Sequence, residues 1–126
     1  MIRRELPKFL IVGTLTVLVD FSTYRGLAAF ALVGTELAKA AGFIAGTTFA
    51  YVANRVWTFG HVSHRPGSAW RFVALYSSTL GANVLVNWFA LKLCADTIGA
   101  VQIAFILATG VSASLNFAGM KFFVFR

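Results

Sequence analysis

The chain has 126 residues, of which 59% are hydrophobic and only 12% are charged, and its formal net charge is +7. An ordinary soluble domain carries about 25% charged residues, and a chain this short cannot hide so much apolar surface in one core. The composition therefore argues against a soluble enzyme or a nucleic-acid-binding domain and favours a membrane protein, in which basic residues lie at the cytoplasmic surface.

Four long apolar runs, separated by short connections, follow one another along the chain. Each reaches the roughly 20 residues that a helix needs to cross about 30 Å of hydrocarbon. The first is too long for the apolar part of a signal peptide, about 7 to 15 residues, so we expect a retained helix. The sequence predicts an all-α integral membrane protein, a single domain over residues 1–126 with spans at Phe9–Val33, Leu37–Val56, Trp70–Leu93 and Val101–Phe125.

The basic residues predict the orientation of these spans. Most lie at the two ends of the chain or beside the middle connection, Gly60–Ala69: Arg3, Arg4, Lys8, Arg55, Arg65, Arg71, Lys121 and Arg126. Because loops rich in Lys and Arg stay in the cytoplasm, we expect both termini and this connection to be cytoplasmic. At the end of the second run, YVANRVWTFG, Arg55 and Trp57 are then typical of an interfacial anchor.

The two halves of the chain resemble each other. A shift of 63 carries Lys8-Phe9 onto Arg71-Phe72 and Asp20 onto Asn83. A shift of 66 carries Tyr51 onto Phe117, Arg55 onto Lys121, Trp57 onto Phe123 and Phe59 onto Phe125. This pattern predicts two tandem hairpins that enter the membrane in the same direction, as parallel repeats.

Small residues recur every four positions in the second and fourth runs. They are Gly42, Gly46 and Ala50 in the second, and Ala108, Ser112 and Asn116 in the fourth. Such spacing favours close helix contacts, although a substrate path is the alternative. Because four helices barely enclose a path, we also expect a homodimer or higher oligomer, with the Gly42 and Gly46 face as a candidate contact.

Several polar residues lie within the apolar runs, where a charge costs about 2.5 to 3.5 kcal/mol. Asp20 is either a hydrogen-bonding clamp between the repeats, with Asn83 as its counterpart, or a group that handles protons or substrate. Asn87 follows Asn83 by four residues and shares its helix face. Arg25 either reaches the outer interface or contacts a phosphate.

No residue pattern indicates catalysis. His61 and His64 have no carboxylate or Cys near them in the sequence, so solvated loop histidines are favoured over a metal site. Cys94 is the single cysteine and is read as a packed or lipid-facing thiol. We expect no enzymatic activity and no cofactor. The sequence contains no nucleotide-binding motif, so any movement of a ligand across the membrane would be facilitated or ion-coupled, with Asp20 as the central acidic candidate.

Four segments together carry a family resemblance: KFLIVGTLTVLVDF, NRVWTFG, RFVALYSSTLGANVLVN and LNFAGMKFFVF. They resemble the GtrA-like family of small four-helix membrane proteins, over about Lys8 to Phe125. The chain departs from the family pattern at Ala50 and Met120, where the family often has asparagine. The positions that match it are Asn54, Arg55, Asn116 and Lys121.

The resemblance implies a function in cell-envelope polysaccharide synthesis. Members are thought to move a polyprenyl-phosphate-linked monosaccharide, such as undecaprenyl-phosphate glucose, across the bacterial cytoplasmic (inner) membrane to a membrane glycosyltransferase. Cations at the cytoplasmic surface would bind the phosphate, and polar side chains would meet the sugar along a groove open to membrane lipids. The predicted substrate-binding residues are Arg55, Lys121, Asn54, Asn116, Asp20, Asn83, Asn87, Arg71 and Trp57, with Lys8 as a further cation.

Two other functions fit the same sequence. The chain can be an accessory module that recruits or stabilises a glycosyltransferase without moving lipid itself. It can also be a proton-coupled exporter of small molecules, in which Asp20 would serve a cation site. The surrounding basic residues disfavour a cationic substrate.

Overall fold

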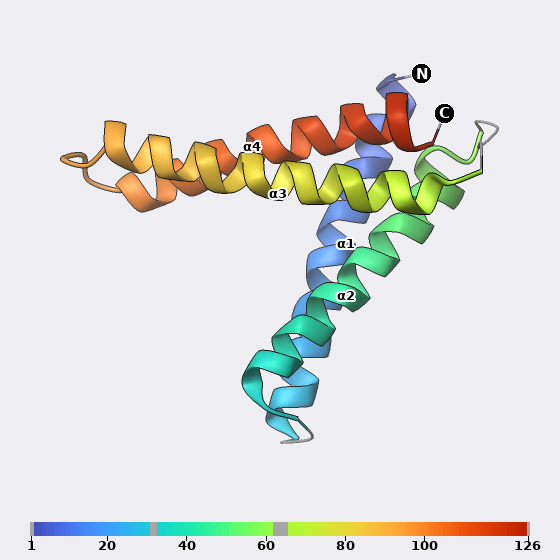
Figure 1. The fold of residues 1–126 in the computed structure, drawn as a ribbon, viewed down its shortest axis with the longest axis horizontal. Helices are drawn as coiled ribbons and strands as arrows, with labels where there is room; N and C mark the ends of the chain where they lie inside the picture. Colours follow the sequence, from blue (N-terminus) through green and yellow to red (C-terminus); the bar gives the residue numbers. More distant parts are fainter. Residues whose placement is uncertain (1, 31–32, 62–65, 126) are drawn as a thin grey trace. The chain divides into compact units, whose positions relative to one another are not determined.

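The computed structural model describes residues 2–30, 33–61 and 66–125, and nearly all of them are helical (Figure 1). The predicted all-α class is confirmed. Within the described ranges there are four α-helices, two of which continue directly into a short π-helix. The elements in chain order are α1 (Ile2–Ala29), α2 (Thr35–Ala53), η1 (Asn54–Thr58), α3 (Ser68–Leu93), α4 (Ala100–Gly119) and η2 (Met120–Val124).

The chain divides into two compact units, Met1–Val62 and Ser63–Arg126. In each unit two helices run side by side, α1 with α2 and α3 with α4, and the second helix ends in the π-helix (Figure 1). The two π-helices are 66 residues apart, since 120 − 54 and 124 − 58 both give 66. This is the displacement that relates the second and fourth apolar runs, so the two units have the same order of elements.

The helix limits differ from the limits of the apolar runs. Helix α1 begins at Ile2, before the predicted start at Phe9, because helical hydrogen bonding continues through charged residues that an apolar run leaves out. It ends at Ala29, not at Val33. Helices α3 and α4 each follow a glycine with positive φ, Gly67 at 87° and Gly99 at 79°, a conformation that other residues rarely adopt.

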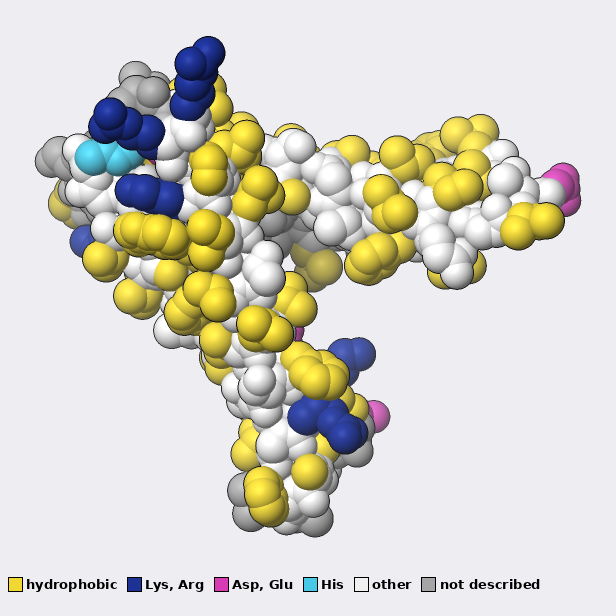
Figure 2. All heavy atoms as spheres, turned by 180° about the vertical axis from the view of Figure 1, so that it is seen from behind, with side chains coloured by type: hydrophobic (Ala, Val, Ile, Leu, Met, Phe, Trp, Pro, Cys, Tyr) yellow, Lys and Arg dark blue, Asp and Glu magenta, His cyan; other side chains and the backbone are white. Residues whose placement is uncertain are grey.

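Two helical stretches are long and apolar enough to cross a membrane by themselves, α1 and the continuous Ala100–Val124. Large apolar side chains are exposed on these stretches and on α2: Phe21, Phe43 and Ile106 each have more than half of their surface accessible, at 58%, 54% and 67%. Hydrophobic side chains cover much of the visible surface of the helices, whereas Lys and Arg gather in patches (Figure 2). Exposed apolar surface on this scale marks a lipid or protein contact.

The small residues of α2 lie against α1. A Cβ atom added at Gly42 would lie 2.6 Å from the backbone oxygen of Asp20, and one added at Gly46 would lie 3.2 Å from that of Thr16. The prediction of a close helix contact is therefore confirmed. The expectation that Gly42 and Gly46 form a contact between subunits is wrong, because α1 of the same hairpin already covers them.

The second unit makes the equivalent contact through hydrogen bonds. The Asn83 amide nitrogen donates to the backbone oxygen of Ala108 at 3.2 Å and to the Ser112 hydroxyl at 3.0 Å. One turn along α3, the Thr79 hydroxyl donates to the side-chain oxygen of Asn116 at 2.7 Å. The small and polar residues of α4 thus join it to α3 within one hairpin.

Candidate functional site

The end of the first hairpin is built around two buried polar side chains of η1. The Asn54 side-chain nitrogen donates to the backbone oxygen of Ala50 at 2.9 Å, and the Thr58 hydroxyl donates to the Asn54 side-chain oxygen at 2.8 Å. Both residues are 1% exposed. The backbone here widens to the π pattern, in which the amide of Phe59 donates to the carbonyl of Asn54 at 2.8 Å. Single π turns inside α-helices are frequent at functional sites.

The second hairpin forms the same π-helix with apolar side chains. Met120 and Val124 occupy the places of Asn54 and Thr58, and both are fully buried. The amide of Phe125 donates to the carbonyl of Met120 at 2.9 Å, as Phe59 does in the first hairpin. The π-helix therefore does not require a polar pair. The presence of Asn54 and Thr58 in the first hairpin needs another explanation.

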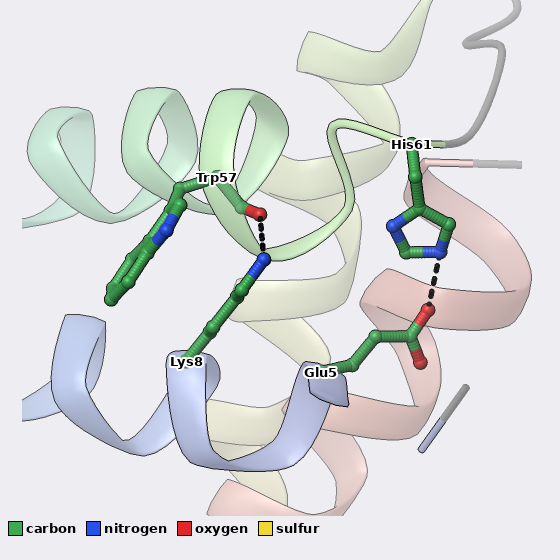
Figure 3. A network of polar contacts seen from close by, with 4 residues as sticks. All are labelled: Glu5, Lys8, Trp57 and His61. Carbon is green, nitrogen blue, oxygen red and sulfur yellow. Dashed lines mark hydrogen bonds and ion pairs between the residues drawn. The ribbon is translucent and has the colours of Figure 1, made fainter. Parts of the chain in front are cut away.

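In each hairpin a cation from the first helix contacts the carbonyl end of the π-helix. Lys8 Nζ donates to the carbonyl of Trp57 at 3.4 Å and lies 5.7 Å from the centre of its ring (Figure 3). Arg71 donates from Nη2 to Val124 O at 2.9 Å and from Nη1 to Pro66 O at 3.0 Å. Cations are stabilised at helix C-termini, where carbonyls carry partial negative charge.

A buried carboxylate distinguishes the first hairpin. Glu5, on the first turns of α1, is 1% exposed, and its Oε1 lies 3.0 Å from His61 Nε2 (Figure 3). The side chain of His61 is 38% exposed. No carboxylate is near His61 in the sequence, but the chain after η1 returns to the start of α1 and brings His61 to Glu5. His64 lies outside the described residues.

These groups surround a small cavity of about 250 Å³. Two cations, a carboxylate, a hydroxyl and an imidazole line it, and they come from the start of α1 and from the end of η1 and the residues after it. The lining residues are Arg4, Glu5, Lys8, Thr58 and His61. An arrangement of this kind can bind a ligand that has both a negative charge and hydroxyl groups.

The cations predicted to bind phosphate occupy different environments. Arg55 is exposed on η1, and Lys121 is half-buried on η2 with Nζ 5.8 Å from the ring centre of Phe122. Arg71 is only 7% exposed, and its guanidinium holds the end of its own hairpin together. Trp57 is 44% exposed beside Lys8. Arg65 and Arg126 lie outside the described residues.

The polar residues predicted along the spans belong to both hairpins and have different surroundings within them. Asn83 and Asn116 bond within the contact between α3 and α4. Asp20 is half-buried against Gly42. Asn87 is half-buried on α3. Neither the Asp20 carboxylate nor the Asn87 amide has a hydrogen-bond partner among the residues that the structure describes.

Sequence reasoning missed Arg4, Glu5, Thr58 and His61 as members of a site. Glu5 offered one signal, because it is an acidic residue among basic ones just before an apolar run. Thr58 offered another, because it lies within the NRVWTF segment that carries the resemblance. Nothing in the spacing alone indicates that His61 meets Glu5, since that contact depends on how the chain turns after η1.

Two apolar helical hairpins, each with buried polar side chains at its end, define a small helical membrane protein. The chain belongs to the family described as GtrA/DPMS, transmembrane domain, whose model matches residues 8–125. Membership of this family indicates a membrane protein whose function concerns polyprenyl-phosphate-linked sugars. No solved structure matches the chain significantly.

Proposed function

We propose that the protein moves a polyprenyl-phosphate-linked monosaccharide, such as undecaprenyl-phosphate glucose, from the cytoplasmic to the outer leaflet of the bacterial inner membrane. A separate membrane glycosyltransferase then uses the sugar in envelope polysaccharide synthesis. The observation that carries the proposal is the polar, cation-lined end of an otherwise apolar hairpin, in a chain of this family. Such a molecule matches a substrate with a charged, hydroxylated headgroup and an apolar tail.

In this proposal all four helices cross the membrane, and both termini are cytoplasmic. The distribution of Lys and Arg supports that orientation, because cationic residues concentrate on the cytoplasmic side. The end of the first hairpin, with Arg3, Arg4 and Lys8 on α1 and Arg55 on η1, then lies at the cytoplasmic surface, where the lipid-linked sugar is made. Lys121 is at the equivalent end of the second hairpin.

Arg55 and Lys121 supply the first contact with the phosphate. An exposed arginine presents a planar fork of donors that suits phosphate bidentately, whereas lysine acts as a point charge. Asn54 is buried and bonded within its own helix end, so we give it a positioning function, holding η1 so that Arg55 faces the surface. Asn87, which is half-buried on α3, can meet sugar hydroxyls during transfer.

Translocation of this kind involves no covalent step and no cofactor. The headgroup passes from water to polar side chains of the protein and then to water on the other side, while the tail stays in lipid. Charged groups are costly in hydrocarbon, by several kcal/mol for each. Polar side chains along the helices lower that cost without any chemical change in the substrate.

One observation favours a second candidate, an accessory module for a glycosyltransferase. Apolar side chains such as Phe21 and Phe43 are more than half exposed, and such surface suits a neighbouring transmembrane helix as well as lipid. An ion-coupled mechanism, including the exporter alternative, requires the Asp20 carboxylate. Unaltered transport by an Asp20→Asn variant across a pH series would remove that carboxylate from the mechanism.

The proposal is tested in membrane vesicles from cells that contain or lack the protein. A radiolabelled polyprenyl-phosphate hexose is formed on one leaflet, and a membrane-impermeant oxidant is added on the other side. We expect the sugar to become accessible to the oxidant much faster when the protein is present. Equal rates in the two preparations, at equal levels of the labelled lipid, favour the accessory module.

A further inference from the structure

We propose that the cavity lined by Arg4, Glu5, Lys8, Thr58 and His61 is the binding site for the headgroup of the lipid, a hexose joined through a phosphodiester. The inference rests on the proposed function and adds a specific subsite to it. Arg4 and Lys8 bind the phosphate, and Glu5 accepts hydrogen bonds from hydroxyls of the sugar. The first hairpin therefore recognises the substrate, and the described residues of the second hairpin have Ser68, not a carboxylate, at the place of Glu5.

The chemistry of the lining fits a sugar phosphate better than a simple anion. Two cations alone would suit any phosphate, but a carboxylate beside them repels an anion, and only hydroxyl donors on the ligand offset that repulsion. An ionised carboxylate is an acceptor only, with room for about four hydrogen bonds, and sugar hydroxyls are donors. Glu5 and the two cations together select a ligand that is anionic on one side and hydroxylated on the other.

The size of the cavity sets a limit on the ligand. Pockets that enclose a drug-sized molecule usually measure about 300 to 1,000 Å³, and this cavity measures about 250 Å³. It can hold one sugar with its phosphate but not a polyprenyl chain as well. Exposed apolar side chains on the same helix, such as Leu6 and Leu10, can meet the start of the tail.

Glu5 lines the cavity although only 1% of its surface is exposed. A carboxylate taken out of water is destabilising unless it is paired and hydrogen-bonded. His61 provides a partner at 3.0 Å, but His61 is itself 38% exposed and lines the cavity. The equivalent residue of the second hairpin is Ser68, since 68 − 63 gives 5, and it is buried without a charge. The hairpin end can thus be built without a carboxylate.

The Asn54 and Thr58 pair gives an independent reason to assign the site to the first hairpin. Met120 and Val124 support the same π-helix without a polar side chain. The hydroxyl of Thr58 donates to Asn54 and keeps its lone pairs, and Thr58 lines the cavity. In the second hairpin Arg71, the counterpart of Lys8, is occupied by two backbone carbonyls. The π-helix therefore does not require the Asn54 and Thr58 pair, and we assign the pair to the ligand site.

Binding to purified protein in lipid nanodiscs tests the site, by calorimetry with two soluble probes. One probe is a short-chain prenyl-phosphoryl hexose, and the other is the same prenyl phosphate without the sugar. The variants are Glu5→Gln and Arg4→Ala, with Glu36→Gln and Arg3→Ala as matched controls. Glu36 and Arg3 are exposed and do not line the cavity. Circular dichroism and gel filtration establish that each variant is folded.

We expect Glu5→Gln to weaken binding of the sugar-bearing probe by about ten- to a hundredfold, the usual effect of losing a hydrogen bond to a charged group. Binding of the sugarless probe should be unchanged or tighter in this variant. Arg4→Ala should weaken the binding of both probes by about tenfold. The control variants should bind both probes as the wild type does. If Glu5→Gln does not fold, Arg4→Ala against Arg3→Ala still decides whether the phosphate binds here.

Two results would overturn the inference, and they differ in what they say of the proposed function. If the wild type binds the sugar-bearing probe and the folded Glu5 and Arg4 variants bind it equally well, the subsite lies elsewhere and the proposed function stands. If the folded wild type binds neither probe, both the subsite and lipid-sugar recognition by this chain are wrong.

Discussion

Thr58 donates its hydroxyl hydrogen to the side-chain oxygen of Asn54 at 2.8 Å, inside a π-helix that forms equally well at Met120–Val124 with no polar side chain at either place. The two halves of the chain therefore share a backbone and differ in chemistry. We interpret the difference as a division of function, in which the first hairpin binds the headgroup and the second completes the membrane domain.

Replacing Thr58 tests this division. Because valine occupies the equivalent place in η2, Thr58→Val should leave the helix content unchanged. It should cost about 1 to 3 kcal/mol of stability, because the buried Asn54 oxygen loses its donor. Transport should fall severalfold, since the cavity loses its hydroxyl. Thr14→Val, which removes an exposed hydroxyl bonded to Leu10 O in the same hairpin, is the control. A variant that transports at the wild-type rate would show that Thr58 has only a structural function.

Arg55 and Lys121 should be required for transport and not for folding. Both are at the surface of a hairpin end, and neither is fully buried. Arg55→Ala should lower transport by about tenfold or more, because charge-assisted hydrogen bonds to phosphate are lost, and Lys121→Ala should have a smaller effect. Immunoblots of membrane fractions should show normal levels of both variants. Loss of the protein from the membrane would instead identify these residues as anchors.

Thr16 and Thr79 are related by the repeat but should respond in opposite ways to the same substitution. The Thr79 hydroxyl is bonded to Asn116, whereas the buried Thr16 hydroxyl has no hydrogen-bond partner among the described residues. An unsatisfied buried hydroxyl is destabilising. Thr79→Val should therefore lower the free energy of unfolding by about 1 to 3 kcal/mol, and Thr16→Val should raise it by up to about 1 kcal/mol. Thermal unfolding in detergent measures both, and equal effects of the two would contradict the hydrogen-bond assignment.

The contact between α1 and α2 should not tolerate a methyl group at Gly42. The added Cβ would lie 2.6 Å from Asp20 O, a backbone atom that cannot move aside cheaply. Gly42→Ala should destabilise the protein by about 1 to 3 kcal/mol. Gly13→Ala is the matched control, because nothing lies within 4 Å of its added Cβ, and alanine favours helix by about 1 kcal/mol. A stable Gly42→Ala protein would mean that the two helices pack less closely than described.

Much of the fold follows from pattern. The apolar runs indicated four helices, and the shift of 66 between Arg55 and Lys121 is also the displacement between the two π-helices. The spacing of Gly42 and Gly46 indicated a close helix contact, because small residues permit one. It could not indicate which helix makes the contact, since an intramolecular and an intermolecular partner leave the same pattern.

The site was less accessible to prediction. Nothing in ANRVWT indicates a π turn, because the change from i−4 to i−5 bonding has no fixed residue signature. Asn54 is buried and bonded within this turn, whereas the sequence predicted it as a substrate-binding residue. The pairing of Glu5 with His61 joins residues far apart in the chain, and only the return of the chain after η1 brings them together.

The central claim is that this chain moves a lipid-linked sugar by itself, and purified protein in liposomes tests it most directly. The measurement is the rate at which a labelled undecaprenyl-phosphate hexose becomes accessible on the opposite leaflet, with Arg55→Ala protein as the control. We predict rapid movement with the wild type. With Arg55→Ala the rate should be at most about one tenth of the wild-type rate. No movement with folded wild-type protein would contradict the claim and make the chain an accessory to its glycosyltransferase.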